Sequence, residues 1–405
     1  MKMSAALVFF VLLPGAAPGL RASEASVVFA VSHYDRQRTY GQCRSTEVFA
    51  VSASGGVPVR VFSDAASYGF KLPCLDGVDN GYNLIAVNPR TRVLYARVYI
   101  FDAKRDVQTA IAEFSLDGSG HHQKLIGGPI VATLQNIFVD SAEDEIGTWD
   151  GSKFSFFDAE TGAHLSDSST RELSQLLEDK CDIGNVIGVG WLDREQKVFL
   201  TLGDPSAEDE DDPETKLLGT WVMGKDGSNL KRIGPPDGAF AIPGYRFFEH
   251  EEFSATLLGQ TADGDYVFTA RMQKAADPAN GPVDFLAISH PETNTKQPRS
   301  KTKKTVPATS TGKIIPTDST NKIVAANSPA TEMMGISLSP AEDSVAYATA
   351  PVDAAGADFR SQPNPSVDVY VKPLTGDPPK KLTTYVPEAF QSAETRLWMI
   401  GWLGN

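Results

Sequence analysis

The strongest constraint on the fold of this chain is a short motif that recurs six times along it. Each copy has an alternating apolar strand, a turn that contains glycine, and a short second strand that carries Lys or Arg. The copies occupy residues 46–62, 111–125, 153–165, 221–234, 284–297 and 367–383, of which 284–297 fits least well. Because self-similarity of this kind is typical of repeat architectures, we expect copies of one supersecondary unit packed side by side.

A second motif precedes five of these copies. It consists of an apolar strand, a tight turn rich in Asp, Pro or Gly, and another apolar strand. The five segments are residues 83–98, 136–149, 188–202, 255–272 and 335–350. Such turn residues favour hairpins because they accept a positive φ or have a preset φ that matches the twist of the strands. Together the two motifs predict a four-stranded antiparallel sheet that repeats along the chain.

The first copy lacks its leading strand. It begins at residues 26–35, which read as the second strand of a sheet, whereas residues 399–405 resemble residues 189–195, the end of a leading strand and its turn. A C-terminal strand that completes an N-terminal sheet closes a ring and removes exposed sheet edges. We therefore predict an all-β fold, a six-bladed β-propeller of four-stranded antiparallel blades, whose first blade is closed by the C-terminal strand.

Part of this pattern resembles a known repeat. Residues 335–350 (GISLSPAEDSVAYATA) followed by 367–383 (VDVYVKPLTGDPPKKLT) resemble the PD40, or TolB-type, β-propeller repeat family, and 221–234 (WVMGKDGSNLKRIG) resembles its third strand, turn and fourth strand. The resemblance implies the propeller fold. Too few residues precede the first blade for the separate N-terminal domain of TolB, so we do not expect TolB itself. A fold does not fix a function, so the activity stays open.

The N-terminus predicts export. Residues 1–22 have Lys2, an apolar core at 5–13 and small residues at 15–22, which is typical of a secretory signal peptide. The apolar core is too short for a membrane-spanning helix, which needs about 20 residues. We expect a periplasmic or secreted protein without a membrane span, with one propeller domain at residues 26–405.

Two segments interrupt the strand pattern of that domain. Residues 168–180 have a capping-box pattern and leucines at helical spacing, which predict a short helix. Residues of about 291–330 are rich in Thr, Ser, Pro and Lys and poor in apolar residues. That composition predicts a flexible insertion.

Charge and cysteine content restrict the partners. The net charge of −14 argues against nucleic acid, whose phosphates require clustered Lys and Arg. Of the three cysteines, Cys43 and Cys74 could form a disulfide, which leaves Cys181 over. Small buried side chains are the alternative reading of these cysteines.

The loop lengths predict where a partner binds. The turns inside both strand pairs share one face of a propeller and are short, whereas most of the connections on the opposite face are long. Binding residues concentrate on long loops held by a rigid scaffold. The first long connection contains the candidate binding residues Tyr34, Arg36, Arg38 and Tyr40, a mixture enriched at binding hot spots, although a solvated loop is the alternative.

A second set of candidates is a polar ring at the channel mouth on the long-loop side. These residues lie at or near the start of each innermost strand: Asn83, Asn136, Asn185, Glu252, Glu332 and Arg396. They could bind a peptide terminus, a sugar or a metal, or they could satisfy backbone groups and water. The acidic segment 207–214 lacks the spaced ligands of a calcium loop, so a solvated loop is favoured there.

Signals for catalysis are weak. The sequence has no Gly-x-Ser-x-Gly elbow, no HExxH and no nucleotide-binding glycine loop. Lys225 and Asp226, in the KDGS turn, are expected to face solvent on the short-turn side. We therefore expect a monomeric, exported, non-catalytic propeller without cofactor that binds a protein or peptide on its long-loop face. The alternative is a six-bladed propeller enzyme, such as a metal-dependent lactonase or hydrolase, with its site at the channel mouth.

Overall fold

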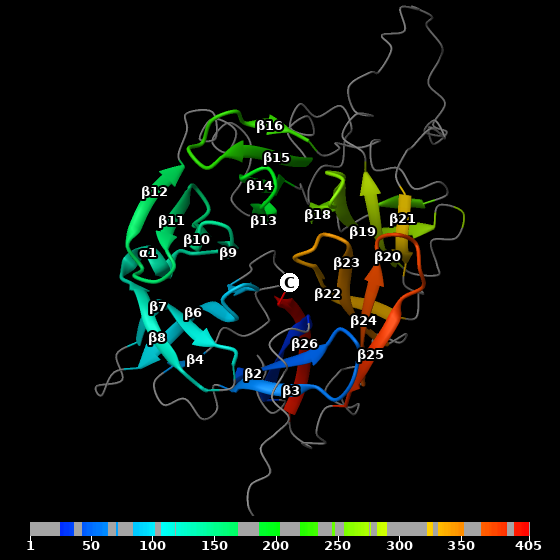
Figure 1. Ribbon diagram of the computed structural model, residues 1–405, viewed down its shortest axis with the longest axis horizontal. Helices are drawn as coiled ribbons and strands as arrows, with labels where there is room; N and C mark the ends of the chain where they lie inside the picture. Colours follow the sequence, from blue (N-terminus) through cyan, green and yellow to red (C-terminus); the bar gives the residue numbers. More distant parts are fainter. Residues whose placement is uncertain are drawn as a thin grey trace, which may run out of the picture.

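The computed structural model shows six β-sheets arranged as blades around a central axis (Figure 1). The structure describes residues 25–35, 43–63, 70–71, 84–101, 107–117, 119–168, 186–202, 219–233, 245–247, 255–274, 276, 282–289, 322–326, 331–351, 366–386 and 393–404. Within these residues the predicted six-bladed, all-β propeller is confirmed. The signal peptide, the predicted helix beyond Ser168 and most of the segment 291–330 lie outside them.

The first three blades are built from the N-terminal half and the last strand. Blade 1 has the order β26 (Ala393–Leu403), β1 (Ser26–Asp35), β2 (Cys43–Ser52) and β3 (Val59–Ser63). Blade 2 contains β4 (Phe70–Lys71), β5 (Ile85–Asn88), β6 (Val93–Phe101), β7 (Val107–Ser115) and β8 (His122–Gly127). A short helix, α1 (Pro129–Ala132), leads to blade 3, formed by β9 (Asn136–Asp140), β10 (Glu145–Trp149), β11 (Phe154–Asp158) and β12 (His164–Ser168).

The other three blades follow in chain order. Blade 4 contains β13 (Val186–Leu192), β14 (Lys197–Leu202), β15 (Gly219–Gly224) and β16 (Lys231–Arg232). Blade 5 contains β17 (Tyr245–Phe247), β18 (Ala255–Gln260), β19 (Tyr266–Lys274), β20 (Pro282–Ser289) and β21 (Lys322–Ala326). Blade 6 contains β22 (Thr331–Leu338), β23 (Ser344–Pro351), β24 (Val367–Pro373) and β25 (Lys380–Tyr385).

The predicted closure of blade 1 is confirmed. Strand β26 pairs antiparallel with β1 along the whole of β1, from Ser26 opposite Leu403 to Asp35 opposite Ala393. The two ends of the folded chain therefore share one sheet, and β1 has a hydrogen-bonded neighbour on both sides.

The apolar core lies between the blades. Alternate residues of each strand point to opposite faces of its sheet, so each face packs on the next blade. Between blades 3 and 4, for example, the buried rings of Trp149, Phe154 and Phe156 pack with Val198 and Met223. Clusters of the same kind join blades 1 and 2, and blades 5 and 6.

The tight turns confirm how the repeats were interpreted. In the KDGS turn, the N–H of Gly227 donates to the carbonyl of Gly224 at 2.8 Å, and Gly227 has a φ of 80°. The side chain of Asp226 accepts from the N–H of Ser228 at 2.9 Å. Asp-Gly therefore forms a hairpin turn between β15 and β16, as the sequence predicted.

Some short elements were not predicted. Strands β4 and β17 extend the ladders of β6 and β19 with only two and three residues, which is too few for a periodic signal. Strand β21 lies within the segment predicted as an insertion and forms the fourth strand of blade 5. The long polar connection before it separates it in sequence from the third strand, so the sequence pattern did not reveal it. None of the described helices has the length and apolar character required to cross a membrane.

Candidate functional site

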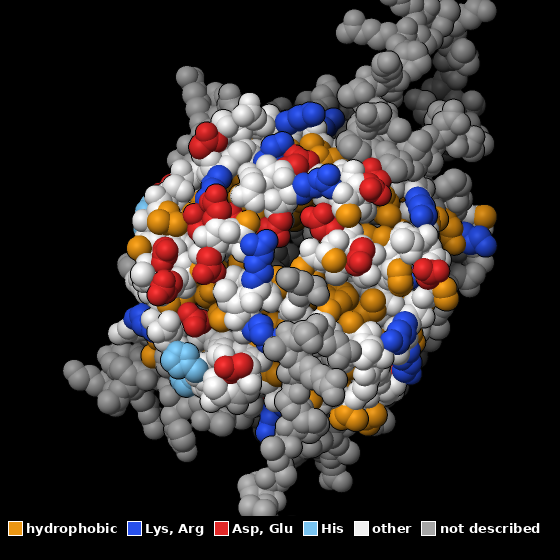
Figure 2. Space-filling view, in the orientation of Figure 1, with side chains coloured by type: hydrophobic (Ala, Val, Ile, Leu, Met, Phe, Trp, Pro, Cys, Tyr) orange, Lys and Arg blue, Asp and Glu red, His pale blue; other side chains and the backbone are white. Residues whose placement is uncertain are grey.

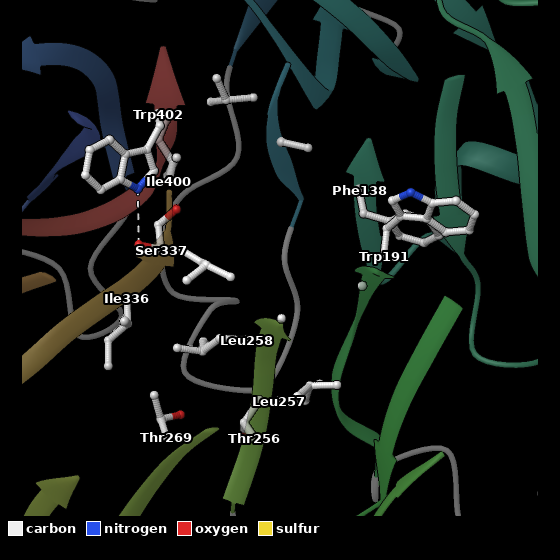
Figure 3. A pocket seen from close by; sticks show the side chains of 18 of the residues that line it. Phe138, Trp191, Thr256, Leu257, Leu258, Thr269, Ile336, Ser337, Ile400 and Trp402 are labelled. Carbon is white, nitrogen blue, oxygen red and sulfur yellow. Dashed lines mark hydrogen bonds between the residues drawn. The ribbon is translucent and has the colours of Figure 1, made fainter. Parts of the chain in front are cut away.

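The central channel contains a cavity of about 630 Å³ (Figure 3). Its walls come from the innermost strand of every blade: β26, β5, β9, β13, β18 and β22. Each of these strands pairs with its sheet on one side only, so N–H and C=O groups along its other edge face the channel. The cavity is therefore lined by backbone donors and acceptors as well as by side chains.

Bulges in the innermost strands shape the wall. In β18 the pairing skips Leu258, and in β26 it skips Ile400. A bulge bends a strand and re-aims the extra residue, and both of these side chains line the cavity. Related irregularities lie in β13 and β22. The apolar parts of the wall thus depend on residues that a regular ladder would place differently.

Aromatic rings reinforce the wall. Trp191 of β13 stacks on Phe138 of β9 with ring centres 6.4 Å apart, and both line the cavity (Figure 3). On the opposite side, the indole N–H of Trp402 donates to the carbonyl of Ser337 at 3.1 Å. The rings are held by neighbouring blades, so the wall between them is preorganised.

Two carboxylates lie at the end of the cavity on the face formed by the short turns, here called the short-turn face. They are Asp193, after β13, and Glu342, between β22 and β23. Figure 2 shows this face, with acidic and basic side chains around a central recess. Burial in the mouth and the charge of Asp140 raise the pKa of Asp193, although Arg90, the Trp191 indole and the Ser141 hydroxyl oppose this.

The pKa of the second carboxylate, Glu342, is also raised. Burial raises the pKa of Glu342, and the charge of Asp193 raises it further, while Arg194 opposes both effects. The two side chains therefore share one electrostatic environment at the mouth. As whole residues, Asp193 is exposed and Glu342 is half-buried. The desolvation of Asp193 acts on its carboxyl end, which lies against Trp191 and Ser141.

The opposite end of the cavity carries a balanced pair. The Nε atom of Arg271 lies 3.7 Å from a carboxylate oxygen of Asp284, and the other oxygen of Asp284 accepts from the N–H of Met333 at 3.0 Å. All three residues line the cavity. The described side chains at this end therefore add little net charge.

Close to the short-turn mouth, Lys225 bridges blades 3 and 4. Its ammonium lies 2.7 Å from Glu143 and 3.8 Å from Asp140, contacts Glu145, and stands 5.1 Å from the ring centre of Phe156. Only 24% of the side chain is exposed. The expectation that Lys225 faces solvent was wrong, because the turn projects it across the blade junction; Asp226 is exposed, as expected.

Within the described residues, Asp140, Glu143 and Glu145 form a group whose spacing suits a metal ion. Their ligand oxygens lie within 4.8 Å of one another. The ammonium of Lys225 lies among them. Burial works against its charge, but the hydrogen bonds that it donates to Glu143 and Glu145 raise its pKa. A cation of the protein itself therefore already balances part of this charge.

The predicted site residues are only partly described. Asn136 begins β9, is 2% exposed and lines the cavity, which places one member of the polar ring in the channel. For Tyr34, Cys43, Glu332 and Arg396 the structure describes the backbone, in β1, β2, β22 and β26. The remaining candidates lie outside the described residues: Arg36, Arg38, Tyr40, Cys74, Asn83, Cys181, Asn185, Glu252 and the segment 207–214.

Sequence reasoning missed Asp193, Glu342 and the contacts of Lys225. Asp193 and Glu342 occupy ordinary turns, and nothing in their local sequence separates them from other turn carboxylates. Lys225 did leave a signal. In blades 2, 3 and 6 the equivalent residue, directly after the third strand, is Leu116, Ala159 and Leu374, respectively. The N–H of each donates to a carbonyl in the turn between the first two strands of its own blade. These three side chains are buried, so the position points inward.

Comparison with known proteins gives structural similarities at low sequence identity and no sequence family. No protein family model and no curated protein sequence matches the chain. Among solved structures, a putative TolB from Agrobacterium tumefaciens matches with a TM-score of 0.45 and 10% identity over 92% of this chain and 99% of that chain.

Two further structures align over much of the chain. A nidogen/laminin complex gives a TM-score of 0.42 and 10% identity, over 93% of this chain and 97% of that one. The tricorn protease gives 0.36 and 10% identity, over 84% of this chain and 34% of that one. The chain is a six-bladed β-propeller with structural similarity to these proteins.

Proposed function

We propose that this protein is an exported, non-catalytic binding propeller that holds a protein or peptide partner, part of which enters the central channel. The observation that carries the proposal is the cavity of about 630 Å³ lined by all six innermost strands. Its volume is in the range of ligand sites, about 300–1,000 Å³. We also propose that the blades are repeats of the PD40, or TolB, type.

The chemistry of the wall favours a peptide. A peptide has alternating amide donors and acceptors and side chains of mixed polarity. The free edges of the innermost strands offer the matching backbone groups, as in recognition by strand addition. Leu258, Ile400 and Trp402 supply apolar surface beside them.

The same wall favours binding over covalent catalysis. Among the described residues that line the cavity, the charged ones are Asp193, Arg271, Asp284 and Glu342, and none is His, Cys or Lys. The serine and threonine hydroxyls there, such as Ser141 and Ser337, thus have no histidine or lysine neighbour in the described lining that could act as their base.

Blocking the channel tests the proposal. Peptides selected from a random 12-residue display library on the wild-type protein are measured by fluorescence anisotropy against Pro340→Trp, which places an indole at the short-turn mouth. We expect the affinity to fall at least tenfold. Glu160→Trp, at an exposed turn of the same face, is the matched control and should bind like wild type. Equal binding by both variants, or no selected peptide, contradicts the proposal.

Export and the face of docking have separate tests. N-terminal sequencing of the protein recovered outside the cytoplasm should start after about residue 22, and intact residues 1–22 would contradict export. Docking of a partner on the long-loop face predicts that an Arg36→Ala/Arg38→Ala variant loses capture of a partner that wild type retains. Unchanged capture would remove that loop from the site.

A further inference from the structure

The ionisable groups of the cavity are distributed unevenly between its two ends. At one end Arg271 and Asp284 lie 3.7 Å apart and largely cancel. At the short-turn mouth Asp193 and Glu342 both line the cavity, and no cationic side chain is among the described residues that line it there. Among the described residues that line the cavity, the unbalanced charge is therefore negative and lies at this mouth.

Nearby arginines reduce this charge without removing it. The guanidinium of Arg194 donates to the carbonyl of Ala262, in the neighbouring turn of blade 5. Arg90 attracts Asp193 from blade 2. Even so, the pKa values of both carboxyls are raised. Burial and the charge of Asp140 outweigh Arg90 at Asp193, and burial and the repulsion from Asp193 outweigh Arg194 at Glu342. A cation that enters the mouth would relieve this repulsion.

Apolar surface adjoins the two carboxylates. Trp191 lies two residues before Asp193 in β13, and Leu338 and Pro340 lie on the chain that leads to Glu342; all three line the cavity. Lysine and arginine have apolar stems with charged ends, and they bury the stem while the charge pairs with a carboxylate. An inorganic ion would make no use of this apolar surface.

We propose that Asp193 and Glu342 form a binding subsite for a basic side chain, Lys or Arg, carried by the peptide segment that enters the channel. This inference rests on the proposed function and specifies its ligand. The ammonium or guanidinium lies between the two carboxylates at the short-turn mouth, and its stem contacts Trp191 and Pro340. The net charge of −14 also attracts basic partners during encounter.

Four peptide libraries test the charge preference. They are acetylated, amidated hexapeptides with one position fixed as lysine, arginine, norleucine or glutamate and the others randomised among uncharged residues. Norleucine keeps the stem of lysine without its charge. We expect wild-type protein to retain the lysine and arginine libraries at least tenfold better than the norleucine library, and the glutamate library least.

Two double variants assign the preference to the mouth. Asp193→Asn/Glu342→Gln should reduce the lysine-to-norleucine ratio to about one while norleucine peptides still bind. Asp226→Asn/Glu160→Gln makes the same change in net charge at exposed turns of the same face and should leave the ratio unchanged. A ratio that falls equally in both double variants would show a general charge effect and overturn the subsite.

Other outcomes separate the two proposals. If all four libraries bind wild type equally and Pro340→Trp blocks them, the channel is a peptide site and the basic subsite is wrong. If no library binds, the proposed function is contradicted and the subsite with it. As a second readout, ¹³C NMR titration of labelled carboxyls should show that a bound lysine peptide lowers the pKa of Glu342, whereas a norleucine peptide should not.

Discussion

The junction between blades 3 and 4 and the ring closure at blades 6 and 1 both hold neighbouring blades together, but by different interactions. The first adds a charged group to its apolar cluster, because Lys225 of blade 4 lies among Glu143, Glu145 and Asp140 of blade 3. The second uses the backbone ladder of β26 with β1 and the apolar cluster that includes Phe29, Met399 and Trp402.

This difference predicts different sensitivities. Backbone ladders and apolar contacts do not titrate, so the closure should be independent of pH over a wide range. An ion pair depends on the protonation of its carboxylates, so the junction between blades 3 and 4 should weaken in acid. Both regions adjoin the channel, since Trp191 and Trp402 line it.

Removal of the closing strand should have the largest effect. Deletion of residues 393–405 leaves β1 as an unpaired edge and uncovers Val27 and Phe29, which are fully buried. We expect the loss of a cooperative thermal unfolding transition, measured by near-UV circular dichroism. A transition that stays cooperative at the wild-type temperature would contradict the role assigned to β26.

The next effect is expected at Gly335, in the bulge of β22 that packs on β26. It has a φ of 68°, and a Cβ there would lie 2.7 Å from the backbone nitrogen of Met399. Gly335→Ala should destabilise the protein by about 2–4 kcal/mol, from left-handed strain and overpacking. Urea denaturation measures this.

A second glycine separates the two contributions. Gly264 also has a positive φ, 91°, but a Cβ there would have nothing within 4 Å. Gly264→Ala should therefore cost only the conformational part, about 1 kcal/mol. If the two variants lose equal stability, the close approach of β22 and β26 at Gly335 contributes nothing to the loss.

At the other region, Lys225→Met should destabilise the protein by about 2 kcal/mol at neutral pH. The substitution leaves the fully buried Asp140 and the partly buried Glu145 without their cation. Removal of one partner from a fully buried pair costs about 3–5 kcal/mol, and partial exposure of Lys225 reduces this. As a control, Lys381→Met removes an exposed partner of Asp368 and should leave the urea midpoint unchanged.

The smallest effect is a change in the pH dependence of stability. The hydrogen bond with Lys225 and its charge lower the pKa of Glu143 below 4.5, so this carboxylate contributes stability above pH 4.5 and loses it as the pH falls through the lowered value. The difference between wild type and Lys225→Met should therefore shrink below pH 4.5. The difference for Gly335→Ala should stay constant, and a parallel decline of both would remove the contrast between the regions.

The fold was predictable because its determinants are local and repeated. Alternating strands and Asp-Gly or Ser-Pro turns recur in register, so even the exchange of the C-terminal strand into blade 1 could be inferred from residues 399–405. The short strands β4 and β17 and helix α1 are held by their neighbours rather than by a pattern of their own.

The candidate site was less predictable because it depends on ring closure. Asp193 and Glu342 are far apart in sequence and reach the same mouth only when blades 4 and 6 take their places around the axis. Asn136 was found because it begins an innermost strand, a position that sequence does specify. Lys225 could have been found by alignment of the blades, since its equivalents Leu116, Ala159 and Leu374 are apolar.

A crystal structure of the protein with a selected lysine-containing peptide tests the central claim most directly. We expect peptide density inside the channel, with the lysine ammonium within hydrogen-bonding distance of Asp193 and Glu342 and its stem against Trp191 and Pro340. Peptide bound on an outer strand edge, with only water in the channel, would contradict binding in the channel.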